Sequence, residues 1–289
     1  MPHSSDVAIE TARAVAKAEL GIESAPVILA DRSNLVLRLD PHPLVARVAM
    51  ATSMVRVGMC WLRREIDISR FLDERGAGVT RPVDHAGPFE RDGLVISFWR
   101  LEAIEGELSP GLAGARLASA HQTLRGFSQE RLPEWGGWIE ARAVLDRARE
   151  SPMIERAALA RIERAWDRGE RIVERARSRT VSFQPVHGDA HLGNVLSTVR
   201  GPVWTDWEDA FVGPVEWDLA CLRSRAALFG EDRASIEHAC AGYDEPLDHT
   251  LVEDLALCRN LQVIPWLAVF AERDPSLLPR MHARIERLP

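Results

Sequence analysis

Lysine is almost absent from this sequence of 289 residues. Lys17 is the only lysine, although the chain has 36 Lys and Arg side chains in total. A site that needs a cation elsewhere must therefore use arginine, whose guanidinium stays charged and binds anions well. A basic excess is missing too, because the formal net charge is −7 and the isoelectric point is about 5.8. This balance argues against a nucleic-acid partner.

Segments that would direct the chain to a membrane are also missing. No run of eighteen apolar residues occurs, and residues 1–5 lack the basic head and apolar stretch that begin a signal peptide. The four cysteines, Cys60, Cys221, Cys240 and Cys258, are scattered and form no C-x-x-C pair. Such spacing favours reduced thiols over a disulfide framework or a zinc site. We therefore expect a cytoplasmic protein with no membrane partner.

The N-terminal third mixes helical and strand patterns. Short β-like runs alternate with segments rich in turn-forming residues, which is typical of a β-meander. The expected elements are a helix over 6–20 that ends at Gly21, strands over 25–30, 35–39 and 44–50, a helix over 54–74, and strands over 79–83 and 94–99.

Helical patterns dominate after residue 106, and only the segment 181–208 interrupts them with short apolar runs. The expected helices cover 112–127, 138–149, 153–178, 215–229, 232–242, 249–271 and 276–287. The chain therefore predicts an α+β fold of two lobes. The smaller, 1–101, contains an antiparallel sheet with helices, and the larger, 102–289, is mainly helical.

One segment carries a distinctive set of polar residues. Residues 187–194 have the sequence His-Gly-Asp-Ala-His-Leu-Gly-Asn, and Asp206 follows twelve residues later. Phosphoryl transfer from a nucleotide needs a carboxylate to accept a hydroxyl proton, and an amide and a second carboxylate to hold Mg²⁺. The same order and spacing occur in the catalytic loop of protein kinases. We therefore expect Asp189 to be a catalytic base and Asn194 and Asp206 to be Mg²⁺ ligands.

The two histidines of this segment raise a different hypothesis. His187, Asp189 and His191 stand at alternate positions, as in some dinuclear phosphoesterase sites. Those sites need further ligands on separate strand ends, and the chain has no second D-x-H and no G-N-H. A metal-dependent phosphoesterase is therefore the weaker alternative. We expect His187 to be structural, with its ring bonded to the loop backbone and bracing Asp189.

The segment from His187 to Leu196 resembles the catalytic loop of the aminoglycoside phosphotransferase and choline-kinase-like family. The segment from Thr205 to Ala220 resembles the part of the family that follows this loop. The family's usual form is H-G-D-x-x-x-x-N and then D-W/F-E-x-A-x-x-G-x-P-x-x-D-L-A. This chain matches the pattern at every other fixed position, but its proline, Pro214, directly follows Gly213, so that Val215 stands where the pattern has proline.

The resemblance implies a bilobal protein-kinase-like fold that binds ATP between the lobes, with GTP left open as the donor. It implies the same roles for Asp189, Asn194 and Asp206 as the spacing does. Asp218 matches a structural position that braces the catalytic loop from the next helix. Glu208 is expected to be solvated or to brace the loop, with a metal role as the weaker alternative.

The N-terminal lobe must supply a cation for the nucleotide phosphates. Residues 44–48 stand where relatives have V-A-I-K, and Arg47 replaces the lysine. In the following helix Glu65 resembles the family's ion-pair partner. By the same comparison, Ser33 and Asn34 form the turn that would cover the phosphates, although no glycine-rich loop is present there. Arginine is suited to this place because a guanidinium binds phosphate and stays charged.

Residues 95–102, before Gly106, fit the hinge between the two lobes. A hinge binds adenine through main-chain groups, and the backbone of Trp99 and Leu101 is expected to do so here. An ordinary buried edge strand would have the same pattern and is compatible with that role.

The acceptor pocket is expected from the helices after residue 215 and from the region 128–150. Acidic residues could bind a polycation there, and tryptophans could line it for a sugar ring or a quaternary amine. The candidates are Asp244, Glu245, Asp248, Glu253 and Asp254, and Trp135, Trp138 and Trp266. No pattern separates an aminoglycoside from choline, homoserine, a sugar, a macrolide or another alcohol.

The sequence thus predicts an ATP- and Mg²⁺-dependent phosphotransferase that acts on a small-molecule hydroxyl, as a monomer or a homodimer. The rival from another class is a nucleotide-binding regulator that no longer transfers phosphate. The intact set of Asp189, Asn194 and Asp206 argues against that rival.

Overall fold

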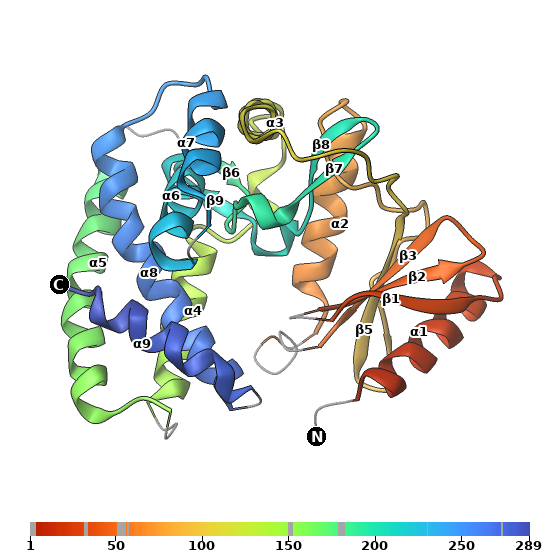
Figure 1. Cartoon of the computed structure of the whole chain (residues 1–289), viewed down its shortest axis with the longest axis horizontal. Coiled ribbons are helices and arrows are strands. Elements are labelled where there is room, and N and C mark those ends of the chain that lie inside the picture. The colour runs from red at the N-terminus through yellow and green to blue at the C-terminus, as the bar shows by residue number, and fades with distance from the viewer. Residues whose placement is uncertain are drawn as a thin grey trace.

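The structure, a computed structural model, describes residues 4–31, 34–50, 56, 58–149, 153–178, 183–229, 231–272 and 274–289, with the side chains of 226–229 excepted. Figure 1 shows a lobe built on a β-sheet beside a larger lobe of packed helices. The predicted α+β fold, with an antiparallel sheet in the first lobe and helices in the second, is confirmed. The exact boundary at residues 101 and 102 stays a prediction.

The sheet of the first lobe is antiparallel, with the strand order β1-β2-β3-β5-β4. Its strands are β1 (Ala25–Asp31), β2 (Asn34–Asp40), β3 (Leu44–Ala49), β4 (Phe89–Arg91) and β5 (Leu94–Arg100). The β4–β5 hairpin turns at Asp92 and Gly93, which both have positive φ. An Asp-Gly pair suits this tight turn, because both of its residues need left-handed backbone.

Side chains alternate between the two faces of this sheet. Leu35, Leu37 and Leu39 are buried against helix α1 (Ser5–Leu20), which covers one face. The residues between them, such as Val36, point to the opposite face, because successive strand residues alternate in direction. In β3 the same alternation turns Arg47 toward the second lobe. The sheet thereby presents one apolar face and one face that can form a site.

Two predicted elements of this lobe differ from the structure. Of the helix predicted over 54–74, residues 54, 55 and 57 lie outside the described residues, and α2 spans Cys60–Asp73, after Gly58 with its φ of 84° and a bend at residues 58–59. The strand predicted over 79–83 is wrong. Gly78 and Thr80 exchange backbone hydrogen bonds with Trp204 of the second lobe, whereas Arg81 accepts from β5. Because this segment bonds to strands of two different sheets, it forms isolated β-bridges and no continuous row of strand hydrogen bonds.

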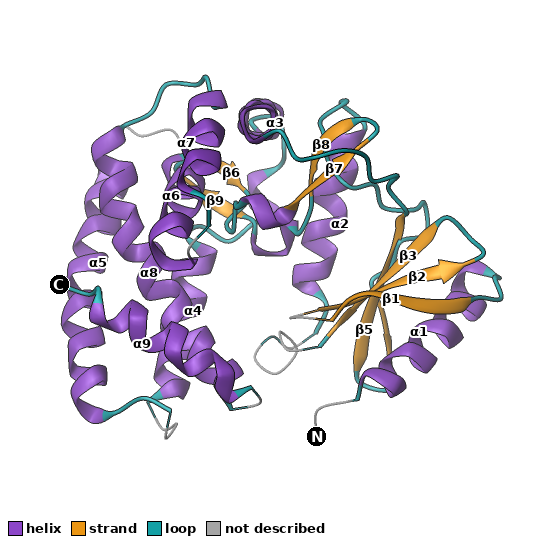
Figure 2. Cartoon of the chain, viewed as in Figure 1, coloured by secondary structure: helices purple, strands orange, loops and turns teal. Residues whose placement is uncertain are grey.

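Helices form most of the second lobe, and Figure 2 separates them from the strands by colour. Helix α8 lies at the centre, with α4, α5, α6 and α9 packed around it. The described helices are α3 (Pro110–Leu124), α4 (Gly136–Ala148), α5 (Arg156–Ser178), α6 (Glu216–Phe229), α7 (Arg233–Gly242), α8 (His249–Ala271) and α9 (Leu278–Glu286). The predicted helices are confirmed, with ends displaced by a few residues.

Two short pairs of strands interrupt these helices where the motif lies. Strand β6 (Gln184–Val186) pairs with β9 (Phe211–Gly213), and β7 (Val195–Thr198) forms a hairpin with β8 (Gly201–Trp204). The hairpin reaches toward α2 and the sheet (Figure 1). The loops between these strands therefore lie where the two lobes meet.

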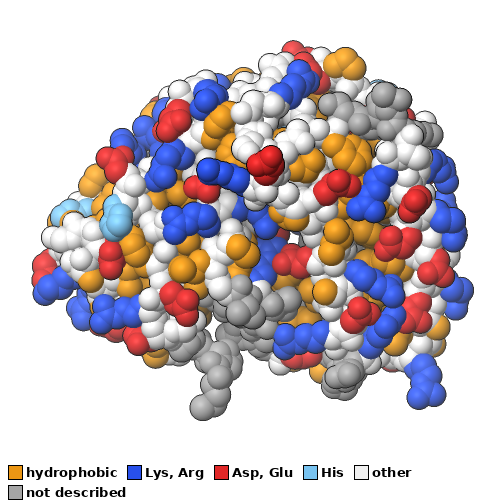
Figure 3. Space-filling model, turned by 180° about the vertical axis from the view of Figure 1, so that it is seen from behind, with side chains coloured by type: hydrophobic (Ala, Val, Ile, Leu, Met, Phe, Trp, Pro, Cys, Tyr) orange, Lys and Arg blue, Asp and Glu red, His pale blue; other side chains and the backbone are white. Residues whose placement is uncertain are grey.

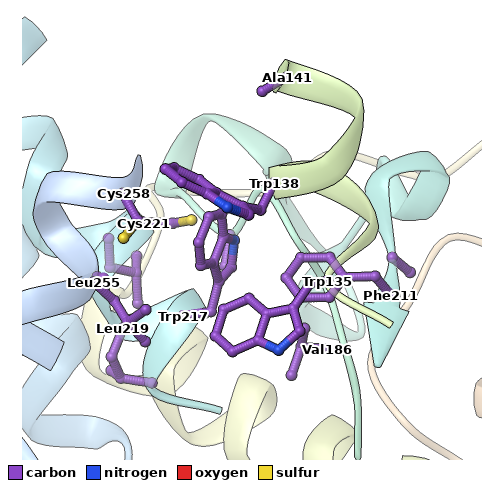
Figure 4. Packing of buried hydrophobic residues seen from close by; sticks show 14 of the residues in the cluster. Trp135, Trp138, Ala141, Val186, Phe211, Trp217, Leu219, Cys221, Leu255 and Cys258 are labelled. Atoms are coloured by element: carbon purple, nitrogen blue, oxygen red, sulfur yellow. The ribbon is translucent and has the colours of Figure 1, made fainter. Parts of the chain in front are cut away.

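Tryptophans form much of the core of the second lobe. Trp135 and Trp138 are buried, and Figure 4 shows them packed with Phe211 and Trp217. The Trp138 ring stacks on Trp166 with the ring centroids 4.3 Å apart. These contacts correct the suggestion that Trp135 and Trp138 line an acceptor pocket, because burial in the core leaves neither ring a free face.

The face of the molecule in Figure 3 shows no accumulation of one sign of charge. On the face in Figure 3, basic and acidic side chains are interspersed over both lobes. The four cysteines are unpaired, and Cys60 is exposed whereas Cys221 and Cys258 are buried. Within the described ranges, no helix combines the length and apolar character needed to cross a membrane.

Candidate active site

The motif loop leaves strand β6 and ends in a 3₁₀ turn at Leu192–Asn194. Gly188 has left-handed backbone with a φ of 85°, which glycine adopts without steric cost. A Cβ atom here would lie 2.2 Å from the carbonyl oxygen of Asp209. Only glycine therefore permits the loop to approach the segment after β8 so closely.

A buried aspartate of α6 holds the backbone of this loop. Asp218 accepts hydrogen bonds from the N–H groups of His187 at 2.7 Å and Gly188 at 2.9 Å. It also contacts His121 Nε2 at 2.9 Å, and Tyr243 lies 2.8 Å from the other nitrogen of that ring. Burial alone raises the pKa of Asp218, but the bonds from His121 and the loop outweigh it and lower the pKa. An ionised carboxylate thus fixes the loop.

His187 connects the two halves of the motif. Its buried ring places Nε2 2.9 Å from the carbonyl oxygen of Thr205, and its Nδ1 accepts from the backbone N–H of Asp189 at 3.3 Å. A single tautomer, with the proton on Nε2, satisfies both bonds. The ring also packs on Trp207, with the centroids 4.5 Å apart. The loop and the segment that leads to Asp206 are therefore held together.

The carboxylate of Asp189 is 23% exposed, and its Oδ1 accepts a hydrogen bond from Arg259. Its Oδ2 lies 3.7 Å from Nε2 of His191. Burial raises the pKa of Asp189, and the charge of Arg259 offsets only part of this effect. Burial and the charges of Arg225 and Arg259 lower the pKa of His191 to about 3, so the ring is neutral near pH 7. The loop presents one carboxylate oxygen, Oδ2, beside a neutral imidazole.

Asn194 and Asp206 lie at the base of the β7–β8 hairpin. The N–H of Thr205 donates to the carbonyl of Asn194 at 3.0 Å, and Asp206 follows with a φ of 69°. The Asn194 amide nitrogen donates to the carbonyl of Asp189 at 3.1 Å. Its amide oxygen is therefore the atom that this side chain can offer a ligand. An amide oxygen and a carboxylate are hard donors, which Mg²⁺ prefers.

Arg47 is the centre of a buried charge cluster between the lobes. It is ion-paired with Glu65 and Asp206 and lies 2.8 Å from Glu208. With its amide oxygen toward the guanidinium, Asn34 accepts from Arg47 at 2.6 Å. Burial raises the pKa of Glu65 to about 8 and that of Glu208 to about 7, against the opposing charge of Arg47. Because Glu208 is buried and bonded to Arg47, it is not solvated, and it braces the segment after β8.

A second arginine, Arg56, forms a cluster that the sequence did not predict. It lies between β3 and α2 and bonds to Glu140 of α4 at 2.7 and 2.8 Å. It is also paired with Asp209 and lies 3.4 Å from Glu208. Its guanidinium carbon is 5.4 Å from the ring centroid of Trp266, which is a cation–π contact. Arg56 thus joins the first lobe to two helices of the second.

A cavity of about 580 Å³ opens between the sheet and the β7–β8 hairpin. We refer to it as the Arg47 cavity. The residues predicted to bind the nucleotide and the metal share it, apart from Ser33, which lies outside the described residues. Its predicted members are Asn34, Arg47, Glu65, Trp99, Leu101, Asn194 and Asp206.

The backbone at the predicted hinge is partly committed to other bonds. The N–H of Leu101 donates to the carbonyl of Pro43 at 2.9 Å. Of the two main-chain groups of Leu101, only the carbonyl oxygen could therefore bond to a nucleotide base. Next to it, the buried Glu102 lies 2.7 Å from Arg200 of the β7–β8 turn and 3.2 Å from Arg81. These pairs connect the hinge to the hairpin that ends at the motif.

A second cavity, of about 200 Å³, lies between α8, α6 and the loop of Asp189. We refer to it as the Arg259 cavity. Its lining combines carboxylates, arginines and an apolar wall. These residues are Arg56, Asp189, Asp206, Glu208, Asp209, Arg225, Arg259, Gln262, Val263, Trp266 and Phe270. Asp206 borders both cavities, so a group bound in one would be close to a group bound in the other.

The acidic residues suggested for a polycation lie elsewhere. Glu245 is bonded to Arg125 at 2.6 Å, and Asp248 caps α8 through the N–H of Leu251. Among the described residues that line the Arg259 cavity there is no member of that acidic set, which comprises Asp244, Glu245, Asp248, Glu253 and Asp254. Of the three suggested tryptophans, Trp266 alone is in this lining.

The structure gives the phosphoesterase hypothesis no support. In the parts of the chain that the structure describes, no group of three or more His, Cys, Asp and Glu side chains is arranged to hold a metal ion. His187 bonds to backbone on both sides of its ring. Its nitrogens are therefore already used within the protein.

Sequence reasoning missed three residues of this region. Arg259 had a signal, because it is the only charged residue between Leu255 and Ala271 in an otherwise apolar helix. A lone charge at such a position favours a buried ionic contact. Arg56 and His121 had no local signal, since their partners are far away in the sequence.

A sequence model described as the phosphotransferase enzyme family matches residues 27–256. The match includes the motif loop, Asp206 and Asp218, together with Arg47 and Glu65. A search of curated proteins finds no match.

Solved structures with the same fold include several small-molecule kinases. The microcompartment-associated aminopropanol kinase has a TM-score of 0.73 and 16% identity, over 98% of this chain and 95% of its own. Spectinomycin phosphotransferase with ADP and spectinomycin has a TM-score of 0.66 and 16% identity, over 100% and 96%. Amicoumacin kinase in complex with AMP-PNP, Ca²⁺ and Ami has a TM-score of 0.66 and 17% identity, over 91% and 89%. The predicted kinase-like fold is confirmed by these similarities.

Proposed function

The chain belongs to the phosphotransferase enzyme family, and on this premise we propose that it transfers the γ-phosphate of ATP to a hydroxyl group of a small molecule. The predicted enzyme class, a phosphotransferase, is confirmed by the family. The observation that carries the finer proposal is the position of Asp206 on both cavities. This position supports assigning the donor to the Arg47 cavity and the acceptor to the Arg259 cavity, which contains Asp189.

Asp189 is the catalytic base in this proposal. Its Oδ1 is held by Arg259, so Oδ2 is the oxygen that would receive the hydroxyl hydrogen bond. The carboxylate orients the hydroxyl and accepts its proton as the phosphoryl group moves, which is the part that side chains play in such transfers. Its raised pKa, caused by burial, favours proton acceptance.

Asn194 and Asp206 would hold Mg²⁺. The fit rests on the donor atoms: one amide oxygen with its nitrogen already committed, and one carboxylate, both on the wall of the Arg47 cavity. When bound, the ion would neutralise the negative charge of the β- and γ-phosphates.

Arg47 would bind the phosphates of the donor from the sheet. It is positioned by Glu65 and Glu208, so the guanidinium would not have to be ordered when the nucleotide arrives. His187 and Asp218 position the loop without contact to substrate. The apolar residues of β2, β3 and the hinge would hold the base, as is usual for cofactor cavities.

The test is a panel of hydroxyl compounds with Mg²⁺ and either ATP or GTP, with release of nucleoside diphosphate as the readout. We expect turnover by the wild-type protein and a loss of about a thousandfold in Asp189→Asn, in line with the removal of an essential base. Glu253→Gln removes one exposed carboxylate of α8 and serves as the matched control.

The alternative of a silent nucleotide-binding regulator makes a different prediction. If it is right, the protein binds the nucleotide but phosphorylates no acceptor. Asp189→Asn then changes neither nucleotide binding nor the release of nucleoside diphosphate. Equal residual hydrolysis in the wild-type protein and the variant would favour that alternative.

A further inference from the structure

We propose that the acceptor is a small hydroxyl compound that carries an oxyanion, either a carboxylate or a phosphate, and that Arg225 and Arg259 recognise this group. The proposal rests on the assignment of the Arg259 cavity to the acceptor. It replaces the polycation and the quaternary amine that the acidic composition suggested.

Two arginines from different helices border the cavity beside Asp189. Arg259 comes from α8 and Arg225 from α6, and both line the same space. Arg259 is 8% exposed and is oriented by Gln262, whose amide oxygen lies 2.5 Å from its Nη1. Arg225 is bonded to Glu231 through Nε at 2.6 Å and is also ion-paired with it through Nη2. A guanidinium presents its N–H donors in a planar fork, which suits it to an oxyanion.

Arginines already neutralise the carboxylates that line the cavity. Asp206 is paired with Arg47, and Asp209 with Arg56. Glu208 lies between these same two arginines, and Asp189 accepts from Arg259. An amine would therefore have to share each carboxylate with a guanidinium, which reduces the negative charge that a cationic acceptor could use.

The pKa of a neighbouring buried arginine is affected by the positive charges on this side of the site. Arg284 of α9 is 1% exposed and bonds to Asn260, which follows Arg259 in α8. Burial and the charges of Arg259 and Arg225 lower the pKa of its guanidinium to about 9. An oxyanion placed near Arg225 and Arg259 would relieve this accumulation of like charge.

The size of the cavity limits the acceptor. Its volume is about 200 Å³, whereas sites for drug-sized ligands usually span about 300–1,000 Å³. The hydroxyl must reach Oδ2 of Asp189 while the oxyanion meets guanidinium groups that border the same carboxylate. The two groups of the acceptor should therefore be only a few bonds apart. Arginine suits this task because its planar fork pairs with both oxygens of a carboxylate or phosphate.

The decisive experiment compares matched acceptors on the wild-type enzyme. The panel contains glycerate, malate and gluconate, each beside its neutral amide, with glycerol phosphate beside glycerol, an amino alcohol, and kanamycin as the polycation. We expect the best kcat/KM for an acid or for glycerol phosphate, by at least about tenfold over its neutral partner, as for a charged hydrogen bond. Comparison of the three acids with glycerol phosphate distinguishes a carboxylate from a phosphate. Preference for an amine or for the neutral partners overturns the proposal.

A variant then tests the assigned residue. Arg225→Gln should reduce the ratio of kcat/KM between the anionic acceptor and its neutral partner about tenfold, through a higher KM. Arg223→Gln, on the same helix but exposed and outside the Arg259 cavity, is the matched control. Arg225 is a better choice than Arg259, because Arg259 also touches Asp189. A ratio that stays within about threefold in Arg225→Gln contradicts the proposal.

Binding separates a failure of this inference from a failure of the proposed function. Calorimetry with Mg²⁺ and ADP present measures whether the same acids bind without any turnover. Binding that weakens about tenfold in Arg225→Gln supports the anion site even if no acceptor is phosphorylated. Phosphorylation of neutral alcohols, with no binding of any acid at millimolar concentration, keeps the proposed function and overturns the inference.

Discussion

The Arg47 cavity and the Arg259 cavity share Asp206, yet different kinds of structure form their walls. The Arg47 cavity lies between a β-sheet and a β-hairpin, and its polar residues belong to short segments with fixed spacing. The Arg259 cavity lies between the long helices α6 and α8 and the loops that carry Asp189 and Asp206, and Arg56 of the first lobe also borders it. The first is determined by local geometry. The second depends on how distant helices pack.

The charges of the two cavities differ in the same way. Arg47 is surrounded by Glu65, Asp206 and Glu208, so the donor side contains its own counter-charges. Near the Arg259 cavity, burial and the charges of Arg259 and Arg225 lower the pKa of a third arginine, Arg284, to about 9.

The largest effect is expected where the two cavities meet. Asp206→Asn should lower kcat about a thousandfold, or about 4 kcal/mol in the barrier, because it removes the anionic ligand proposed for Mg²⁺. It also removes one of the carboxylates that surround Arg47. Steady-state kinetics with both substrates varied is the measurement. A loss smaller than tenfold would contradict the role of Asp206 as a residue common to both sides.

The sequence could indicate which residues share the Arg47 cavity because their signals are local, whereas their roles stay predictions. Asp189, Asn194 and Asp206 have fixed spacing, and the alternation of β3 predicts which way Arg47 points. The same reasoning failed over residues 79–83, where the backbone bonds to two different sheets. It failed for Trp138 as well, because composition alone does not distinguish a core ring from a pocket ring. Arg56 could not be predicted, since its partners Glu140 and Asp209 lie 84 and 153 residues away in the sequence.

The next largest effect concerns Asp218, which holds the backbone of the motif loop. Asp218→Asn should lower the free energy of unfolding by about 3 kcal/mol at pH 7, because it removes a buried charge that accepts hydrogen bonds from His121 and the loop. The pKa of Asp218 is lowered in the folded protein. Its stabilisation is therefore present above its ordinary pKa and is lost as the pH falls through the folded value. Urea unfolding at several pH values measures this.

The matched control for this change is Asp232→Asn. Asp232 caps α7 at an exposed position, and asparagine caps helices about as well, so the change should stay within about 0.5 kcal/mol. We expect the difference between the wild-type protein and Asp218→Asn to shrink below about pH 4, where an ordinary aspartate takes up its proton. A difference that is constant between pH 3 and 7 would show that the charge of Asp218 contributes nothing.

A smaller effect should be confined to the donor side. Arg47→Lys should raise the KM for the nucleotide about thirtyfold, because an ammonium group is a point charge and cannot replace the fork that contacts Glu65 and Glu208. The KM for the acceptor should change less than threefold by the same argument. Arg13→Lys, on the exposed face of α1, is the control. Equal changes in both KM values would mean that the two cavities respond as one.

The smallest effect should be confined to the acceptor side. Trp266 lines only the Arg259 cavity of the two, and its ring lies 5.4 Å from the guanidinium carbon of Arg56. Trp266→Ala should raise the KM for the acceptor about tenfold, by the loss of an apolar wall and a cation–π contact, and leave the KM for the nucleotide unchanged. Trp266→Phe keeps an aromatic face and should recover most of the loss. If the alanine variant instead weakened the nucleotide, the division between the two cavities would be wrong, because this side chain reaches the donor only through Arg56 and Glu208.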